Sequence, residues 1–247
     1  MKYIIYILIF ASLVIASFFI YKNYFKNKEN MAISNTKNSL EKNKNIENNS
    51  AKKEYKIVAF GDSLTAGLNV DLKDSYPSIL QDALNKGMTK VGKEGQNVNF
   101  KIINMGVSGE TTTGGLERVD FVILQNPDLI LLGLGANDML RATNPSSVKD
   151  NLEKIIISLQ AKNIPIIILG MESQVSNGFE YKNNFDNIYP NLAKKSNLPL
   201  VPFFLKGVVG VNSFNTSDGI HPNRKGYEKI INENILPVLL PFLEKNI

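Results

Sequence analysis

The chain has 247 residues, of which 43% are apolar and 21% charged, as is usual for a globular protein with one core. Its formal net charge is +5, but nine lysines against three glutamates fall within residues 1–53, so the remainder is close to neutral. Because the remainder carries no basic excess, we do not expect a nucleic-acid partner. With no Cys and a single His, the chain also lacks the ligands of zinc, haem and iron–sulfur sites, so neither a metal nor a cofactor is expected.

Residues 1–21 are predicted to form a transmembrane anchor or a signal segment. Residues 3–21 are uncharged and, as a helix, would span about 28 Å, close to the thickness of the bilayer core. A cleaved signal peptide is the alternative, because small residues around Ala16 have the spacing that signal peptidase prefers. We expect an uncleaved anchor with the folded domain outside the cytoplasm, in the periplasm or at the cell surface. Lys22, Lys26 and Lys28 after the run favour the opposite orientation by the positive-inside rule.

Residues 22–53 are predicted to be a disordered linker. Asn and Lys dominate this segment, and almost no apolar residue in it is available to join a core. Such a linker reaches about 30 Å, which lets a domain move near a membrane surface. One folded domain is therefore expected over residues 54–247, with the membrane as a partner through residues 1–21.

The folded domain alternates short apolar runs with longer helical patterns, which is typical of an α/β protein. Strands are predicted at residues 56–60, 98–104, 129–133, 164–169 and 200–202. Helices are predicted at residues 75–85, 113–125, 145–162, 179–196 and 224–245. The middle strands are apolar on both faces, as in a covered parallel sheet. We predict a three-layer α/β/α sandwich with a five-stranded parallel, doubly wound, flavodoxin-like sheet, and functional residues at the carboxyl ends of its strands.

The first predicted strand is followed by the segment GDSLTAG at residues 61–67. Gly61 permits a sharp turn, after which Ser63 presents its hydroxyl and its own backbone N–H at the rim of the sheet. Ser63 is therefore a candidate nucleophile. An ordinary turn with a helix N-cap is the alternative, since Gly, Asp and Ser are common in both.

Two further loops follow the second and third predicted strands. The backbone N–H groups of the segment GVSGE at residues 106–110 are candidates to face the same cleft in such a fold. A simple turn before a helix is the alternative. In GLGAND at residues 133–138, the Asn137 amide is a candidate donor to an anion, and a polar loop is the alternative.

Near the C-terminus, the segment SDGIHPN at residues 217–223 contains the only His of the chain. A lone His is often a structural or surface residue. Asp218, however, lies three residues before His221, and in a turn this spacing lets the carboxylate accept a hydrogen bond from one ring nitrogen. The other nitrogen is then available to take a proton from a serine hydroxyl. The pair is a candidate base with its orienting acid.

These four segments, in this order, resemble the four blocks of the GDSL, or SGNH, hydrolases. The similarity extends from about Ile57 to the C-terminus. More narrowly, five segments resemble the periplasmic thioesterase I, lysophospholipase and arylesterase group: NMGVSGETTTGGLERV, LGANDMLR, IYPNLAK, LPLVPFF and DGIHPNRKGY. One departure is Ala136, where that group commonly has Gly.

The resemblance implies a serine hydrolase for acyl esters or thioesters, including aryl esters and lysophospholipids. It implies a catalytic triad of Ser63, His221 and Asp218. It implies oxyanion donors at the backbone of Ser63, the backbone of Gly106 and the amide of Asn137. Asp218 would orient His221, and no cofactor is needed.

The substrate is less determined by the sequence. Residues 171–184 follow the fourth predicted strand and are either the wall of an acyl pocket or a connecting loop; Leu64, Met171 and Phe179 are the candidate substrate-binding residues. An O-acetyl esterase acting on envelope polysaccharide is an alternative enzyme, and a catalytically silent binding module on the same fold is an alternative class. A small-molecule substrate and a monomer are expected.

Overall fold

The computed structural model describes residues 53–86 and 98–247. The predicted N-terminal anchor at 1–21 and nearly all of the predicted linker at 22–53 lie outside these residues. No helix within the described ranges is both long and apolar enough to cross a membrane. The first strand begins at Lys53, next to the expected start of the folded domain.

The centre of the described fold is a five-stranded sheet in which every neighbouring pair is parallel. Its order is β2-β1-β3-β4-β5, which is the flavodoxin-like, doubly wound arrangement. The strands are β1 (Lys53–Gly61), β2 (Val98–Gly106), β3 (Leu129–Gly133), β4 (Ile166–Leu169) and β5 (Leu200–Val201). The four residues from Leu129 to Leu132 in β3 and all four residues of β4 are buried, because helices cover both faces. The predicted fold class is confirmed.

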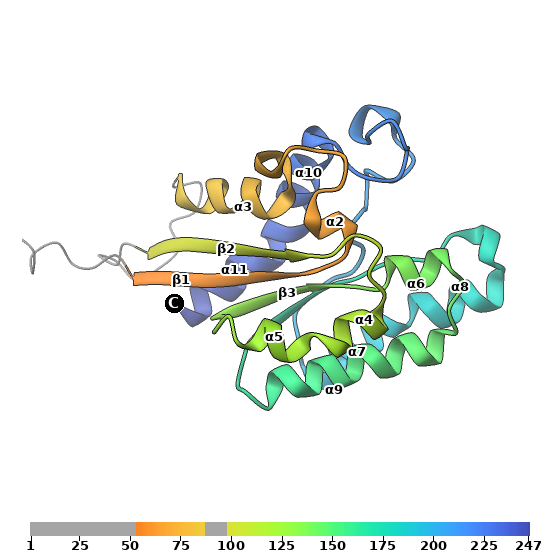
Figure 1. Cartoon of the computed structure of the whole chain (residues 1–247), viewed down its shortest axis with the longest axis horizontal. Helices are drawn as coiled ribbons and strands as arrows, with labels where there is room; N and C mark the ends of the chain where they lie inside the picture. Colours follow the sequence, from red (N-terminus) through yellow and green to blue (C-terminus); the bar gives the residue numbers. More distant parts are fainter. Residues whose placement is uncertain (1–52, 87–97) are drawn as a thin grey trace, which may run out of the picture. The chain divides into compact units, whose positions relative to one another are not determined.

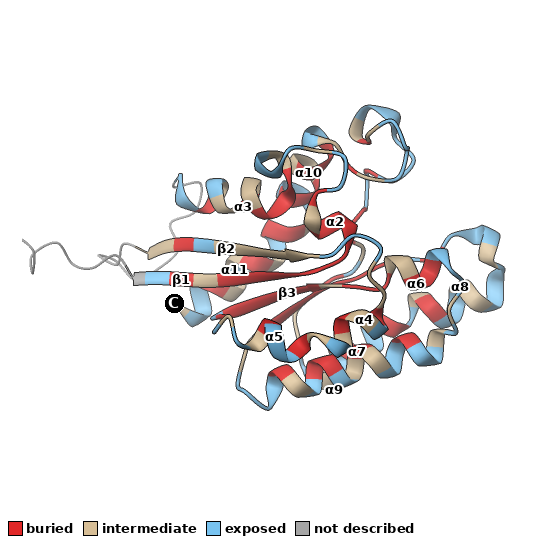
Figure 2. Ribbon diagram, viewed as in Figure 1, coloured by how far each residue is buried: buried red, intermediate tan, exposed pale blue. Residues whose placement is uncertain are grey.

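Helices flank the sheet on both sides (Figure 1). On one side lie α3 (Tyr76–Asn85) and α10 (Arg224–Ile230), and on the other lie α4 (Thr112–Glu117), α5 (Val119–Ile123), α7 (Pro145–Gln160) and α9 (Ile188–Ser196). The short α2 (Ser63–Ala66), α6 (Ala136–Leu140) and α8 (Phe179–Asp186) lie towards the carboxyl ends of the strands. Figure 2 shows that the buried residues gather along the sheet and on the helix sides that face it.

Three predicted helices are interrupted in the structure. The helix predicted at 113–125 is two helices, because Arg118 leaves helical geometry between α4 and α5. The helix predicted at 179–196 is likewise divided, between α8 and α9 at Asn187. The helix predicted at 224–245 contains a π-helical turn at Ile231–Ile235 before α11 (Leu236–Asn246). Pro237 follows this turn and has no N–H to donate to a carbonyl of the preceding turn, which favours a local change of hydrogen bonding.

Three glycines align across the carboxyl ends of the central strands. Gly61 of β1 is paired in register with Gly106 of β2 and with Gly133 of β3. A Cβ at Gly106 would lie 2.1 Å from the backbone nitrogen of Ala66. The close approach of α2 to the end of β2 therefore requires Gly at this position, because every other residue type carries a Cβ. The connections leaving β1 and β3 diverge at this edge, which is where ligands bind in doubly wound sheets.

Candidate active site

The turn after β1 presents Ser63 as the first residue of α2. Oδ1 of Asp62 accepts the N–H of Leu64 at 3.0 Å and so caps the helix. The N–H of Ser63 has no partner within a helix, because the first N–H groups of a helix never do. Ser63 lines the cleft described below, and no described residue accepts a hydrogen bond from its N–H, so this N–H is available to a group bound beside the hydroxyl.

Ser63 is joined to His221 and Asp218 by a chain of hydrogen bonds. Oγ of Ser63 lies 2.8 Å from Nε2 of His221, and Nδ1 of His221 lies 2.6 Å from Oδ2 of Asp218. Since the carboxylate can only accept, the ring proton belongs on Nδ1, and Nε2 is left as the acceptor for the serine hydroxyl. The structure thus brings together three side chains that lie up to 158 residues apart in the chain.

The Asp218 carboxylate is held by more than its contact with the imidazole. Oδ1 accepts from the backbone N–H groups of Ile220 (2.8 Å) and His221 (3.0 Å) and from Oγ1 of Thr216 (2.9 Å). Burial acts to raise the pKa of Asp218, but the N–H groups of His221 and Ile220, the imidazole and the Thr216 hydroxyl together hold this pKa well below its usual range. Oδ2 also accepts from Nδ2 of Asn69 at 2.7 Å. The carboxylate is therefore ionised at any pH near neutrality.

Asn137 enters the site from α6, directly after β3. Its Nδ2 donates to the carbonyl oxygen of Glu110 at 3.0 Å. An amide group carries two N–H bonds, so the second remains for a ligand. Asn137 and Ser63 line the same cleft, and the amide is thus placed to donate to an oxygen bound there.

The structure does not support the prediction for Gly106. Its single N–H donates to Oδ1 of Asn104 at 2.9 Å, so this N–H is not free to bind an oxyanion. The glycine is explained instead by the close approach of α2 to the end of β2. Gly109, three residues later, has a φ of 80°, and its N–H has no hydrogen-bond partner among the described residues. It directly precedes Glu110, whose carbonyl holds the Asn137 amide.

A buried ion pair anchors the loop that contains Gly109 and Glu110. Nε of Arg118 donates to Oε1 of Glu110 at 2.6 Å, and the two side chains are 19% and 7% exposed. Nη2 of Arg118 donates to the carbonyls of Gly61 (3.2 Å) and Met105 (2.8 Å), and the guanidinium lies 4.6 Å from the ring centre of Phe60. Arg118 therefore connects the ends of β1 and β2 to the loop that holds Asn137.

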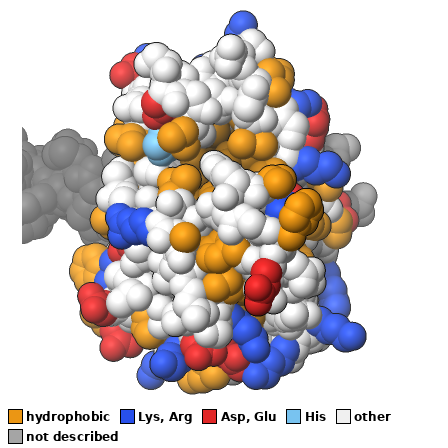
Figure 3. Space-filling model, turned by 90° about the vertical axis from the view of Figure 1, so that its right-hand side faces the viewer, with side chains coloured by type: hydrophobic (Ala, Val, Ile, Leu, Met, Phe, Trp, Pro, Cys, Tyr) orange, Lys and Arg blue, Asp and Glu red, His pale blue; other side chains and the backbone are white. Residues whose placement is uncertain are grey.

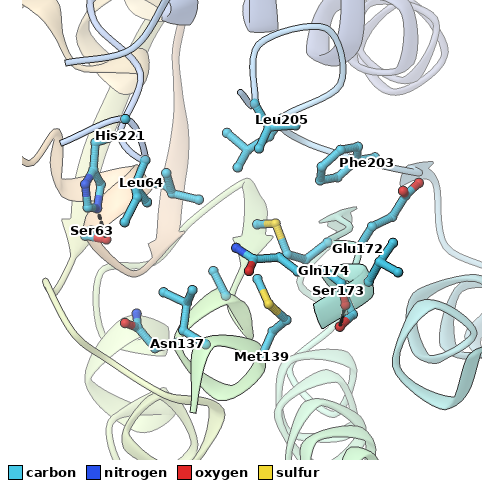
Figure 4. Close-up of a pocket in the computed structure, with 17 residues that line it drawn as sticks. Ser63, Leu64, Asn137, Met139, Glu172, Ser173, Gln174, Phe203, Leu205 and His221 are labelled. Carbon is cyan, nitrogen blue, oxygen red and sulfur yellow. Dashed lines mark hydrogen bonds between the residues drawn. The ribbon is translucent and has the colours of Figure 1, made fainter. Parts of the chain in front are cut away.

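An apolar cleft of about 310 Å³ extends away from Ser63 and His221. Figure 3 shows the hydrophobic side chains that gather beside His221 and along the hollow of this face. Figure 4 shows Ser63, His221 and Leu64 on one side, Asn137 and Met139 below, and Leu205, Phe203 and Glu172 towards the far end. Its lining includes two of the predicted substrate-binding residues, Leu64 and Met171.

The structure does not bring Phe179 to this cleft. The side chain is 83% exposed and is absent from the cleft lining. Phe179 is the first residue of α8, and the helix buries Phe185 rather than Phe179. Val175 takes part in the lining from the preceding 3-10 turn at Val175–Asn177.

Comparison with known proteins agrees with this geometry. The family model of the GDSL-like lipase/acylhydrolase family matches residues 59–229. The chain belongs to this family. It is 30% identical to the esterase TesA of Pseudomonas aeruginosa over 76% of this chain and 89% of that protein. It is 36% identical to an arylesterase of Vibrio mimicus over 68% of this chain and 80% of that protein.

A solved structure of a relative gives the same result for the fold. The crystal structure of AlinE4, an SGNH-hydrolase family esterase, has a TM-score of 0.62 and 38% identity over 77% of this chain and 97% of that chain. The protein is therefore an ester hydrolase of the GDSL-like family. Within the described residues, no group of three or more His, Asp or Glu side chains is placed to hold a metal ion.

Several residues of this hydrolase site carry no recognisable signal in the sequence. Asn69 and Arg118 contact the site across large separations in the chain and lie outside the residues predicted for it. Phe203 belongs to the segment LPLVPFF, and Leu205 directly follows it; this segment shows the family resemblance but has no pattern typical of a cleft wall. Tertiary contacts alone reveal these residues.

Asp62 is a further ionisable group of the GDSL turn, and it is buried completely. Burial raises its pKa to about 7; the N–H of Leu64 opposes this shift, and the negative charges of Glu110 and Asp138 add to it. Its Oδ2 has no hydrogen-bond partner among the described residues. The acid form of Asp62 is therefore favoured by its surroundings, in contrast to the ionised Asp218.

Proposed function

We propose that the hydrolase acts by two-step acyl transfer with Ser63 as nucleophile, His221 as general base and Asp218 as its orienting acid. His221 takes the hydroxyl proton as Oγ attacks the carbonyl carbon, and then donates this proton to the departing alcohol or thiol. Water, deprotonated by His221, releases the acid in the second step. The observation that carries the proposal is the Ser63–His221–Asp218 hydrogen-bond chain at the mouth of an apolar cleft.

We propose three donors for the negative oxygen that forms during attack. They are the N–H of Ser63, the free N–H bond of the Asn137 amide and the N–H of Gly109, which replaces Gly106. The hydrogen bond from Asn137 to the Glu110 carbonyl supports this set, because it places the amide beside the loop of Gly109. Donors fixed in advance stabilise the developing charge without reorganisation at the moment of reaction.

We propose acyl esters and thioesters with a medium or long chain as substrates, such as aryl esters and lysophospholipids. The support is the cleft, whose lining by Met139, Met171, Phe203 and Leu205 suits an acyl chain better than a sugar. An O-acetyl esterase for envelope polysaccharide is the alternative. It would need only the space next to Ser63 and would leave the apolar far end of the cleft without a role.

The first experiment measures hydrolysis of aryl esters of increasing acyl length by the full chain and its Ser63→Ala variant. We expect activity to peak at medium or long chains and to be abolished in the variant. Ser78→Ala, which removes a hydroxyl from α3 that bonds the Leu72 carbonyl, is the matched control and should retain activity. Activity on acetate esters alone would favour the polysaccharide esterase, and near-normal turnover by Ser63→Ala would exclude Ser63 as nucleophile.

We also propose that residues 1–21 carry the domain to the outside of the cytoplasm and tether it there as a monomer. Support comes from the uncharged run at residues 3–21 and from the Asn/Lys-rich segment after it. Protease treatment of spheroplasts should degrade the domain if it is outside the cytoplasmic membrane, and membrane fractions should retain it if the segment is uncleaved.

A further inference from the structure

Asn69 contacts the same carboxylate oxygen of Asp218 that binds His221. Its Nδ2 lies 2.7 Å from Oδ2 of Asp218, and Nδ1 of His221 lies 2.6 Å from that oxygen. Asn69 lies two residues after Gly67, the C-cap residue of α2, which is the helix that begins with Ser63. One amide therefore joins the segment of the nucleophile to the loop that carries the base.

We propose that Asn69 is a positioning residue that orients the Asp218 carboxylate for His221; the inference rests on the triad proposed above. The other hydrogen bonds to this carboxylate come from within residues 216–221, that is, from the loop of Asp218 itself. Those bonds orient the carboxylate relative to its own loop only. Among the described residues, the Asn69 side chain is the one donor to this carboxylate from another part of the chain.

A purely structural role of Asn69 in its turn is the alternative to a positioning role, and an experiment can separate the two. Its φ is 67°, in the left-handed region, where Asn is among the better tolerated residues. Asn is therefore compatible with a role in the turn alone. Gly adopts this conformation at no steric cost, so Asn69→Gly keeps the backbone and removes only the amide.

The amide acts on the step in which the imidazolium forms. Without the amide, the carboxylate is no longer held against Nδ1 of His221 from outside its own loop, so the imidazolium that forms during attack is stabilised less and kcat falls. A residue with a purely structural role in the turn would leave kcat unchanged in Asn69→Gly, because Gly keeps the turn.

Other charged groups lie on the elements packed around Asp218 and His221, and they remain unchanged in the variant. They are Asp62 in the turn before Ser63, the Asp71–Lys73 pair in the loop of Asn69, and the pair of Asp74 with Arg224 of α10. The tyrosines near this region are Tyr76 and Tyr227, whose pKa values burial raises well above the usual range, so both stay neutral. A change in kcat is thus attributable to the amide.

The test is the measurement of kcat and KM for the full chain, Asn69→Gly and the control Asn163→Gly. Asn163 also has a left-handed backbone, with a φ of 56°, and it lies before β4, at the opposite end of the sheet from the site. We expect Asn69→Gly to lower kcat about threefold to tenfold at an unchanged KM, as for one partly exposed hydrogen bond to a charged group.

Asn69→Asp keeps the size of the side chain and places a second carboxylate against Asp218. We expect it to lower kcat more than tenfold, because like charges at this distance repel. The inference is overturned if both variants of Asn69 match Asn163→Gly in kcat. If Ser63→Ala is inactive in that case, the proposed triad still stands; if Ser63→Ala is active, the triad fails whatever Asn69 does.

Discussion

The two ends of the cleft are built in different ways. At the Ser63 end, polar side chains are fixed by directional hydrogen bonds of 2.6–3.0 Å: Ser63 to His221, His221 to Asp218, and Asn137 to the Glu110 carbonyl. At the far end, the apolar side chains of Met139, Phe203 and Leu205 form much of the wall, beside the polar residues Glu172, Ser173 and Gln174.

This difference separates the chemistry of the enzyme from its choice of substrate. A hydrogen-bonded group must lie within a few tenths of an ångström of its partner, so the polar end tolerates few changes. Packing against an acyl chain tolerates changes of shape, at the cost of altered preference. Substitutions at the two ends should therefore differ in kind as well as in size.

The largest effect on stability is expected for Glu110→Gln, which leaves Arg118 buried without its counter-charge. Breaking a buried ion pair on one side costs about 3–5 kcal/mol. Because Arg118 is 19% exposed, we expect about 3 kcal/mol, measured as the free energy of unfolding in urea. Asp82→Asn is the matched control, since its pair with Lys86 is exposed and should contribute little. Equal losses in the two variants would contradict the role assigned to Arg118.

Asn137→Ala tests the polar end directly. We expect kcat to fall by roughly 10²–10³, the scale for loss of one oxyanion donor, with KM nearly constant. Asn187→Ala removes an amide that bonds the carbonyl of Asn183 on α8, away from Ser63, and should leave kcat unchanged. A fall of less than tenfold in Asn137→Ala would exclude the amide as a main donor.

Asp62→Asn tests the buried acid under the nucleophile. Because the pKa of Asp62 is raised from 3.8 to about 7 in the fold, its contribution to stability is full below about pH 4 and is lost as pH rises to about 7. The neutral amide removes this loss, so the variant should be more stable than the wild type at pH 8, on the order of 4 kcal/mol. At pH 4 the two should unfold alike. A stability difference that is the same at both pH values would show that Asp62 is not the cause.

The smallest effect is expected at the apolar end. Leu205→Ala enlarges the far part of the cleft and should raise the ratio of kcat/KM for long over short acyl esters by roughly tenfold. This ratio does not depend on the folded fraction. Leu239→Ala makes a comparable cavity in the core of α11, away from the cleft, and should lower stability while leaving the ratio unchanged. An unchanged ratio in Leu205→Ala would mean that the acyl chain does not reach Leu205.

The strands and the catalytic residues were predictable from the sequence, whereas the breaks between helices were not. Strand positions, parallel pairing and sheet order were predictable, because apolar runs and helical periodicity are local properties. The positions of Ser63, Asp218 and His221 after predicted strands were also readable, and the structure brings the three side chains together. The breaks at Arg118 and Asn187 were not predictable, since the periodicity continues through both.

The sequence by itself determined the α/β architecture, the family and the residues able to act as nucleophile, base and acid. These follow from short segments whose order along the chain places them at one edge of a parallel sheet. Only the tertiary structure decided that the Gly106 N–H is occupied, that Phe179 does not line the cleft, and that Asn69 reaches Asp218. The physical reason is separation: Asn69 and Asp218 are 149 residues apart, and no local pattern encodes a hydrogen bond that exists only after the whole sheet has been packed.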